Sequence, residues 1–174
     1  MENLETKRLN FRLYEGKDKR MFIALMTDAE VMKRVGDGVL TPEGAEKLWK
    51  KLLENFYPGG EKTIWAIWAK ENGRYIGHAS IRPRPEKKED WEIGYIIRRE
   101  EWGKGFASEI AMKLVDYGFK KLKLPEIFAT IDDENYPSIK VAEKAGLRFS
   151  NYEFDDLGRF SVYSIKSPMN KNSK

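Results

Sequence analysis

The most informative part of the chain joins an apolar segment, a glycine turn and a long amphipathic segment. Residues 91–97 lead through Gly103 and Gly105 into a helical pattern that begins at Phe106. In such an arrangement, free backbone N–H groups and the helix dipole face an incoming anion. A side chain at either glycine would hold a pyrophosphate away from these amides. The spacing excludes a Walker A loop, and Ser108 stands where a Rossmann fingerprint needs Gly or Ala. The alternative is a strand-to-helix turn that needs only a positive φ.

A carboxylate, Glu92, stands inside the apolar segment between Trp91 and Ile93. Apolar neighbours raise the pKa of a carboxylate, which makes it a better proton acceptor. An amine with a pKa of about 8–10 is mostly protonated at neutral pH, so its acylation needs such an acceptor. The alternatives for Glu92 are a rim carboxylate or a salt bridge to an arginine. His78 is either a second proton carrier or a structural histidine.

Two motifs carry a family resemblance. The sequence reads EIGY at 92–95 and WGKGFASE at 102–109, and further along NYPS at 135–138 and KAGL at 144–147. With these motifs the chain resembles the GNAT superfamily of acetyl-CoA-dependent N-acetyltransferases, and within it the RimJ/RimL-like branch. The resemblance extends over residues 6–166, because the expected order of strands and helices also agrees with the family.

The resemblance implies acetyl-CoA as co-substrate. Its pyrophosphate would lie on the glycine turn, and its pantetheine would thread a splayed strand pair as a pseudo-strand. A main-chain N–H around residues 95–97 would stabilise the developing oxyanion. The residues expected to contact the cofactor are Tyr95, Ile96, Ile97, Arg98, Trp102, Gly103, Lys104, Gly105, Phe106, Ala107, Ser108, Asn135, Ser138 and Lys144.

The chain departs from the family pattern at two positions. Glu100 replaces the Gln or Arg that usually opens the glycine motif, a change that is common in this branch. Ala142 stands where many relatives have a tyrosine that protonates the leaving thiolate. Ser138, Tyr163 or water must then supply the proton, unless the thiolate leaves unprotonated. The expected catalytic residues are therefore Glu92, Ser138 and Tyr163, with an N-cap as the structural alternative for Ser138.

Hydrophobic periodicity predicts a mixed α/β (α+β) fold. We expect a GNAT fold with a mostly antiparallel sheet of about seven strands, one splayed strand pair, and helices on both faces. The expected strands are 8–13, 63–69, 74–81, 91–97, 126–131 and two that flank Leu157-Gly158; the expected helices are 18–35, one from the Thr41 cap to Pro58, 106–122 and 137–145. Four aromatic residues at regular spacing are core residues or pocket walls: Trp49, Phe56, Trp65 and Trp68.

Length and composition fit one domain. The 174 residues are 41% hydrophobic and 34% charged, which is typical of a single folded unit. We expect one N-acetyltransferase domain over 1–174, with a folded core at 6–166 and a frayed tail at 168–174. No apolar run approaches the roughly 20 residues that span a bilayer, and the N-terminus shows no secretory leader. We therefore expect a cytoplasmic protein without membrane contact.

The composition also excludes several chemistries. Without cysteine, thiol catalysis, disulfides and thiolate metal sites are impossible. A single histidine makes a zinc site or a Ser-His-Asp triad improbable, so no metal is expected. The net charge of +4 comes from interspersed signs, without the basic block of a nucleic-acid-binding arm. Lys140 and Lys144 are expected either to contact the 3′-phosphoadenosine or to be solvated.

The predicted activity is transfer of acetyl from acetyl-CoA to a primary amine, by direct attack on the thioester. The acceptor is a peptide N-terminus or a small amine. Glu153, Asp155 and Asp156 either attract a cationic substrate or form a solvated strand end. The alternative function is a non-catalytic acetyl-CoA sensor. Family resemblance favours a monomer or a homodimer.

Overall fold

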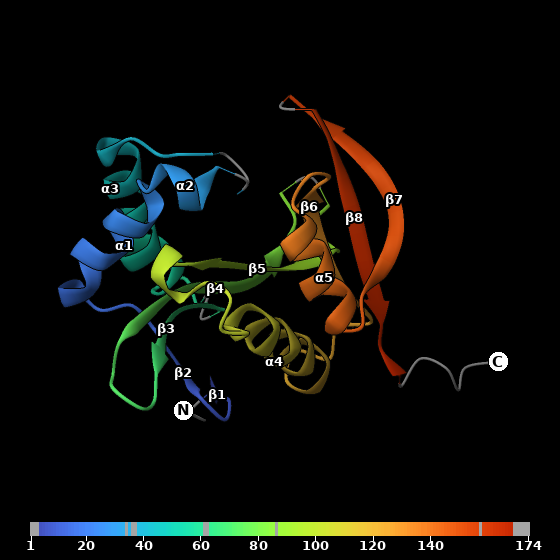
Figure 1. Ribbon diagram of the computed structural model, residues 1–174, viewed down its shortest axis with the longest axis horizontal. Helices are drawn as coiled ribbons and strands as arrows, with labels where there is room; N and C mark the ends of the chain where they lie inside the picture. Colours follow the sequence, from blue (N-terminus) through green and yellow to red (C-terminus); the bar gives the residue numbers. More distant parts are fainter. Residues whose placement is uncertain are drawn as a thin grey trace. The chain divides into compact units, whose positions relative to one another are not determined.

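The computed structural model describes residues 4–33, 35, 38–60, 63–85, 87–156 and 158–168 (Figure 1). It contains an eight-stranded sheet in the order β1-β2-β3-β4-β5-β6-β8-β7. The strands are β1 (Leu4–Glu5), β2 (Leu9–Arg12), β3 (Ile64–Ala69), β4 (Tyr75–Pro83), β5 (Trp91–Ile97), β6 (Glu126–Asp132), β7 (Arg148–Asp155) and β8 (Gly158–Lys166). The helices are α1 (Lys19–Met26), α2 (Ala29–Met32), α3 (Pro42–Lys51), α4 (Phe106–Lys120) and α5 (Tyr136–Lys144), with short turns η1 (Gly16–Asp18), η2 (Leu52–Phe56) and η3 (Arg99–Glu101).

The predicted mixed α/β fold is confirmed. The sheet has eight strands instead of about seven because the two-residue β1 pairs with β2, which the sequence pattern did not indicate. β5 pairs with β6 in parallel, whereas β2 with β3, β3 with β4, β6 with β8 and β7 with β8 are antiparallel. Gly36, Asp37 and Leu157 of the predicted turns, and residues 169–174 of the predicted tail, lie outside the described residues.

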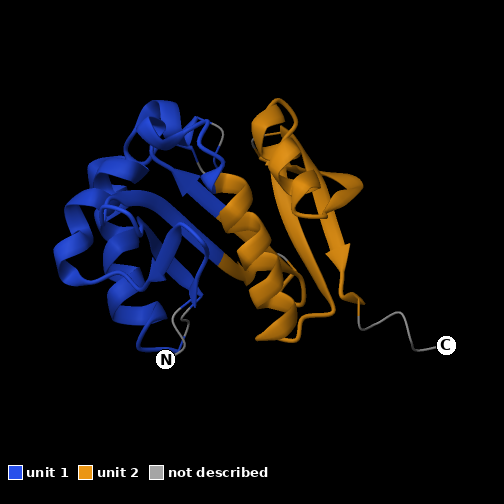
Figure 2. Ribbon diagram, turned by 60° about the horizontal axis from the view of Figure 1, so that its bottom comes forward, with its two compact units in different colours: residues 1–80, 95–106 blue, residues 81–94, 107–174 orange. Residues whose placement is uncertain are grey.

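The chain forms two compact units (Figure 2). Unit 1 comprises Met1–Ser80 and Tyr95–Phe106, and unit 2 comprises Ile81–Gly94 and Ala107–Lys174. Strands β4 and β5 and helix α4 each contribute residues to both units. The prediction of a single domain over 1–174 stays a prediction.

The core of unit 1 forms where α1, α2 and α3 cover one face of its strands. Phe22 and Trp49 pack with Ile64 and Ala66 of β3, and all four side chains are buried. β3 is buried along almost its whole length because it lies between β2 and β4. Of the four aromatic residues singled out above, Trp49 is therefore a core residue. Trp65 is buried too, with its ring edge against Phe11.

The first predicted helix, 18–35, is wrong as one element. α1 ends at Met26, and Asp28 then caps α2, accepting hydrogen bonds from the backbone N–H groups of Glu30 and Val31. An Asp at this position competes with helix continuation because its side chain satisfies the first amides of a new helix. The next predicted helix begins as expected, since the Thr41 hydroxyl accepts from the Gly44 N–H at 3.1 Å.

Unit 2 packs α4 and α5 against its strands. Gly118 of α4 lies against β6 so closely that a Cβ there would come within 2.6 Å of the Ile127 side chain and 2.9 Å of that of Ile81. Glycine therefore sets the distance between this helix and the strands. β7 is the outermost strand in the sheet order, and nearly all its residues are exposed. No helix in the described part of the chain is long and apolar enough to cross a membrane.

Candidate active site

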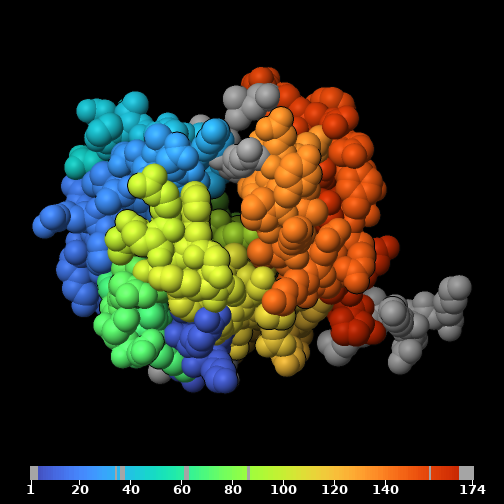
Figure 3. Space-filling model, in the orientation of Figure 1, coloured from blue at the N-terminus to red at the C-terminus, as the bar shows by residue number. Residues whose placement is uncertain are grey.

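The glycine turn has the geometry of an anion-binding loop. Gly103 and Gly105 have φ angles of 74° and 78°, in the left-handed region that favours glycine. A Cβ on Gly103 would meet nothing within 4 Å, and one on Gly105 would lie 3.6 Å from Nη2 of Arg8. The segment around residue 100 lies on the surface shown in Figure 3. Within the described residues, the N–H groups of Gly103, Lys104 and Gly105 donate no hydrogen bond to the protein. These amides are available to an anion.

Charged side chains hold this turn in place. Arg8 donates to the Lys104 carbonyl at 2.9 Å, and its guanidinium lies 4.5 Å from the centre of the Phe106 ring. The Lys104 ammonium donates to the Glu100 carbonyl at 2.7 Å and to Glu101 at 3.0 Å. Burial alone raises the pKa of Glu101, but the hydrogen bonds from Lys104 and Arg74 bring it below its ordinary value. Lys104 therefore stabilises the turn through its side chain.

Strand β4 and the indole of Trp102 hold the last residues of β5 and the turn that follows it. The Arg98 N–H donates to the Ile76 carbonyl at 3.0 Å. At Gly77 any Cβ would collide with the Ile96 carbonyl oxygen, so only glycine allows this approach. The Trp102 indole N–H donates to the Ile97 carbonyl at 2.8 Å. Tyr95 and Ile96 are half-buried and Ile97 is buried.

Glu92 lies in a polar cluster of unit 2. The Thr130 hydroxyl donates to Oε2 of Glu92 at 3.1 Å, and Arg84 Nε lies 3.9 Å from the same oxygen. Arg84 instead forms its short contact with Glu153, at 2.7 Å. Desolvation raises the pKa of Glu92, although the Thr130 hydrogen bond and the charges of Arg84 and Arg82 oppose the shift. Glu92 is thus a half-buried carboxylate that forms a long ion pair with Arg84, whose short contact is with Glu153. Its role as a proton acceptor stays a prediction.

The N-terminus of α5 is capped by Asn135. Its side-chain oxygen accepts from the Ser138 N–H at 3.3 Å, so the alternative in which Ser138 is the N-cap is wrong. Ser138 occupies the third helical position, where its hydroxyl is not needed for capping. Ala142 is buried, while Lys140 and Lys144 are exposed. Ala107 and Ser108 are half-buried in the first turn of α4.

Tyr163 lies on the opposite face of the sheet from Glu92. Glu92 pairs with Phe128, whereas Tyr163 pairs with the next residue of β6, Ala129, and successive strand residues point to opposite faces. The Tyr163 ring is buried and packs edge-on against Phe149. Burial raises the pKa of Tyr163, which keeps its hydroxyl protonated at neutral pH.

Two further residues that the sequence offered as candidates, His78 and Glu153, contact neighbouring side chains. The Tyr14 hydroxyl lies 2.8 Å from the Tyr75 hydroxyl and 3.3 Å from Nδ1 of His78, and the Tyr14 and His78 rings are stacked. Burial raises the pKa of Tyr14 well above its ordinary value. This environment supports the structural reading of His78. Glu153 is an ion-pair partner of Arg84 and Lys87, not a solvated strand end.

Sequence reasoning missed Arg84, Thr130 and Glu153 as neighbours of Glu92. Arg84 and Glu153 are 69 residues apart in the chain. The one available signal was an arginine in a proline-rich segment just before the Glu92 strand. The predicted cofactor residues up to Phe106 belong to unit 1, and Ala107, Ser108, Asn135, Ser138 and Lys144 belong to unit 2.

Comparison with known proteins identifies the family. Residues 8–148 match the family model described as Acetyltransferase (GNAT) domain. The chain is 35% identical over 141 residues to the "Uncharacterized N-acetyltransferase p20" of Bacillus licheniformis, covering 81% of this chain and 79% of the relative. It is 32% identical over 166 residues to the "Uncharacterized protein YkkB" of Bacillus subtilis (strain 168), covering 94% and 95%. The chain therefore belongs to the GNAT acetyltransferase family, and it is an acyltransferase.

Solved structures show the same fold. A GNAT-family acetyltransferase from Bacillus anthracis superposes with a TM-score of 0.79 at 28% identity, covering 94% of this chain and 98% of that one. A spermidine N-acetyltransferase from Vibrio cholerae, in complex with CoA and spermine, superposes with a TM-score of 0.76 at 18% identity, covering 93% and 97%. At that identity the second likeness concerns the fold alone.

Proposed function

We propose that this acyltransferase moves an acetyl group from acetyl-CoA to a primary amine. Two local observations support acetyl-CoA as the donor. The glycine turn at residues 103–105 precedes α4 and has three amides without a hydrogen-bond partner in the described part of the chain, which suits a pyrophosphate. The parallel pairing of β5 with β6 joins Trp91 to Ile127 and Glu92 to Phe128, at the beginnings of both strands. A strand pair joined at one end is what a pantetheine chain inserted further along would require.

The observation that carries the proposal is the environment of Glu92. The carboxylate is desolvated, its pKa is raised, and its Oε2 accepts a hydrogen bond from Thr130. Glu92 accepts the proton of the attacking ammonium, directly or through one water, and so generates the neutral amine. Bound acetyl-CoA supplies the thioester carbon that this amine attacks. A main-chain N–H around residues 95–97 stabilises the charge that develops on the carbonyl oxygen.

The proton for the leaving sulfur has two candidate sources on the chain. Ser138 is the third residue of α5, after the Asn135 cap. Tyr163 is the second candidate, and its side chain points to the face of the sheet opposite to Glu92. Ala142 supplies no donor, so a tyrosine at that place is not part of this mechanism. We assign Ser138 first, because it belongs to the same motif as Asn135.

The acceptor is a peptide N-terminus or a small amine, as in the RimJ/RimL-like branch whose motifs the chain shares. The neighbouring fold from Vibrio cholerae binds spermine, which illustrates the small-amine case. We further propose a cytoplasmic enzyme that works as a monomer or homodimer.

A screen of acceptors with release of free CoA as the readout tests the proposal. The panel comprises N-terminal peptides, linear polyamines and aminoglycosides, each with acetyl-CoA and the full chain. Release of CoA that depends on one amine, and that fails in Glu92→Gln, is the expected result. Binding of acetyl-CoA without release for any amine would instead identify a sensor.

A further inference from the structure

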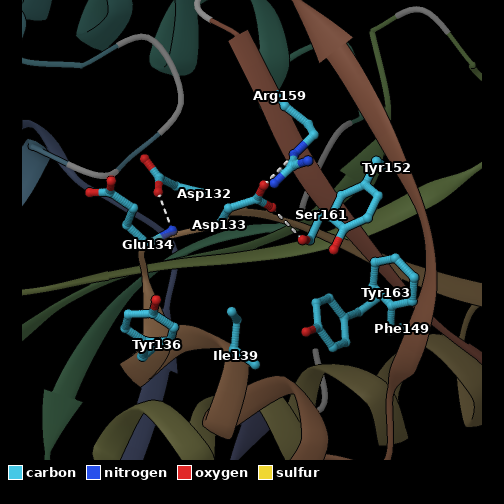
Figure 4. Close-up of a pocket in the computed structure, with 10 residues that line it drawn as sticks. All are labelled: Asp132, Asp133, Glu134, Tyr136, Ile139, Phe149, Tyr152, Arg159, Ser161 and Tyr163. Atoms are coloured by element: carbon cyan, nitrogen blue, oxygen red, sulfur yellow. Dashed lines mark hydrogen bonds and ion pairs between the residues drawn. The ribbon is translucent and has the colours of Figure 1, made fainter.

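The two faces of the sheet in unit 2 differ in how their charged side chains are paired. One face carries the pocket of Figure 4, in which Asp133 accepts hydrogen bonds from Arg159 and from the Ser161 hydroxyl. The opposite face carries Glu92. On the strand beside Glu92 stands Arg82, whose side chain has no hydrogen bond or ion pair in the described part of the chain. Arg82 is therefore the unpaired charge of this face.

Arg82 lies directly opposite Glu92. Strands β4 and β5 are neighbours in the sheet. Backbone hydrogen bonds join the two ends of this strand pair, from Arg98 to Ile76 and from Arg84 to Asp90. The residue numbers of both bonded pairs have the same sum, so the antiparallel register is constant between them and residue 82 faces residue 92. Side chains opposite each other share a face, with Cβ atoms about 4.5–5.5 Å apart.

Despite this placement, Arg82 and Glu92 form no ion pair. The Glu92 carboxylate instead accepts from Thr130 of β6, on the other side of β5, at 3.1 Å. The second arginine near Glu92, Arg84, is only 7% exposed and contacts Glu153 at 2.7 Å. The positive charge of Arg82 still acts on Glu92, because it opposes the rise in the pKa of that carboxyl. Arg82 is thus a cation beside the proposed proton acceptor, and no carboxylate within the described ranges is paired with it.

The end of the Arg82 side chain is accessible to a ligand. The residue is half-buried, and Nε is its one guanidinium nitrogen that is buried without a partner among the described residues. Its two terminal nitrogens therefore reach solvent. A guanidinium binds a carboxylate through two parallel N–H···O bonds, which fix the orientation of the carboxylate. An anion bound in this way would lie beside the amine that Glu92 deprotonates.

We propose that the acceptor is a free α-amino acid, in which a single carbon atom joins the amine to a carboxylate. The inference rests on the proposed acetyl transfer. The carboxylate binds the terminal nitrogens of Arg82, and one ammonium proton passes to Glu92. The N–C bond then forms as the C–S bond of the thioester breaks. The nitrogen loses a further proton while the sulfur takes one, so CoA leaves as the thiol and the product is an N-acetylamino acid.

This proposal narrows the choice of acceptor by charge. A polyamine or an aminoglycoside has no anionic group for Arg82, and a peptide N-terminus presents an amide where the amino acid has its carboxylate. A carboxylate at Arg82 would also compensate the guanidinium at the moment when Glu92 becomes neutral by taking the proton. An amine without an anionic group would leave that positive charge unpaired.

A matched acceptor screen with the full chain and acetyl-CoA tests the proposal. Each common amino acid is compared with its own amide, which keeps the amine and the side chain and lacks the negative charge. Release of free CoA is the readout, and N-terminal peptides and linear polyamines complete the panel. At least one free amino acid should exceed its amide tenfold or more in kcat/KM. The amine of the amide is the less basic of the two, so this preference cannot come from easier deprotonation.

Variants of Arg82 then test the residue itself. Arg82→Gln should abolish the preference for the free acid, with a rise in KM of at least tenfold and a smaller change in kcat. Arg82→Lys keeps the charge without the planar fork, so its KM should fall between those of the parent and Arg82→Gln. Lys88→Gln is the matched control, because it removes the same charge from an exposed residue between β4 and β5. Thermal stabilisation by acetyl-CoA shows that each variant is folded.

The outcomes separate this proposal from the acetyl transfer on which it rests. Transfer to amides, peptides or polyamines at least as efficient as to every free amino acid would overturn the proposal and leave acetyl transfer intact. A preference for the free acid that survives in Arg82→Gln, or that Lys88→Gln removes equally, would overturn it too. The comparison of acid with amide needs no variant, so it decides even where Arg82→Gln does not fold. No release of CoA with any amine would refute acetyl transfer and this proposal together.

Discussion

At the scale of single residues, Glu92 is the side chain on which the proposed chemistry depends. Glu92→Gln keeps the size of the side chain and removes its ability to accept a proton. Turnover with the best acceptor should fall by about 10²–10⁴ at pH 7. The loss should shrink at high pH, where the amine is already neutral. Stabilisation by acetyl-CoA should persist and serves as the control. An unchanged pH–rate profile would make Glu92 a structural carboxylate.

Glu153 controls the charge that Arg84 presents to Glu92. The Arg84 hydrogen bond lowers the pKa of Glu153 to about 2, so this carboxylate stays ionised and retains the guanidinium. Glu153→Gln should release Arg84 toward Glu92, on which the charge of Arg82 also acts. Asp90 remains a second carboxylate partner of Arg84, at 3.8 Å. Removing a negative charge and approaching a positive one both lower the pKa of Glu92.

The acidic limb of the kcat/KM profile should therefore move to lower pH in Glu153→Gln. The direction follows because Glu92 acts when deprotonated, and a lower pKa extends that state downward in pH. Asp156→Asn, an exposed change in the same hairpin, should leave the limb in place. A limb that stays fixed in Glu153→Gln, or moves upward, would contradict the link between Arg84 and Glu92.

At the scale of elements, the turn between β5 and α4 requires both its glycines. Gly103→Val/Gly105→Val should abolish the thermal stabilisation that acetyl-CoA gives, since the new side chains strain the left-handed turn and cover its amides. Gly73→Val is the matched control: Gly73 has a φ of 65° in the hairpin between β3 and β4, and a Cβ there meets nothing within 4 Å. Full response to acetyl-CoA in the double variant would remove the turn from the cofactor site.

The N-terminus of α5 contains both a capping residue, Asn135, and a candidate general acid, Ser138. Asn135→Ala should lower the free energy of unfolding by about 1 kcal/mol, because it deletes the N-cap. Ser138→Ala should leave stability nearly unchanged and slow single-turnover acetyl transfer about 10²-fold. Melting temperature and transfer rate are measured on the same samples, with Tyr163→Phe in parallel. A rate loss only in Tyr163→Phe would move the acid there, and unimpaired transfer in both would exclude a side-chain acid.

Local sequence signals predicted those elements whose ends are set by neighbouring residues. The bounds of β5 were correct at 91–97, and Thr41 caps α3 as expected. These signals failed at positions where a polar residue can lie either inside a helix or at its cap. Asp28 divides the first helix, and Asn135 rather than Ser138 caps α5. In both cases the residue type fits either a helix interior or a cap, so residue type alone does not place the end of the helix.

At the scale of the whole molecule, contacts between segments far apart in the chain could not be predicted from the sequence. The sheet order places β7 beside β8 and β8 beside β6, and this order brings Tyr163 to Phe149. Arg84, which directly follows β4, contacts Glu153 of β7 although those two strands are not neighbours in the sheet. No local pattern encodes strand order, because every half-buried strand shows the same alternation. Glu92 was therefore predicted as a candidate from its own strand, but its partners were not.

The two compact units should unfold together. β4 and β5 each run from one unit into the other, so melting one unit alone would break both strands within their length. Such interruption is unfavourable because helices and sheets form cooperatively. Tryptophan fluorescence reports mainly unit 1, which holds Trp49, Trp65, Trp68 and Trp102, while far-ultraviolet circular dichroism reports both units. The two probes should give coincident urea transitions. Acetyl-CoA at 100 times its dissociation constant should raise the unfolding free energy by about 2.7 kcal/mol by both probes. Separate midpoints would show two independently folding units and would contradict the single-domain prediction.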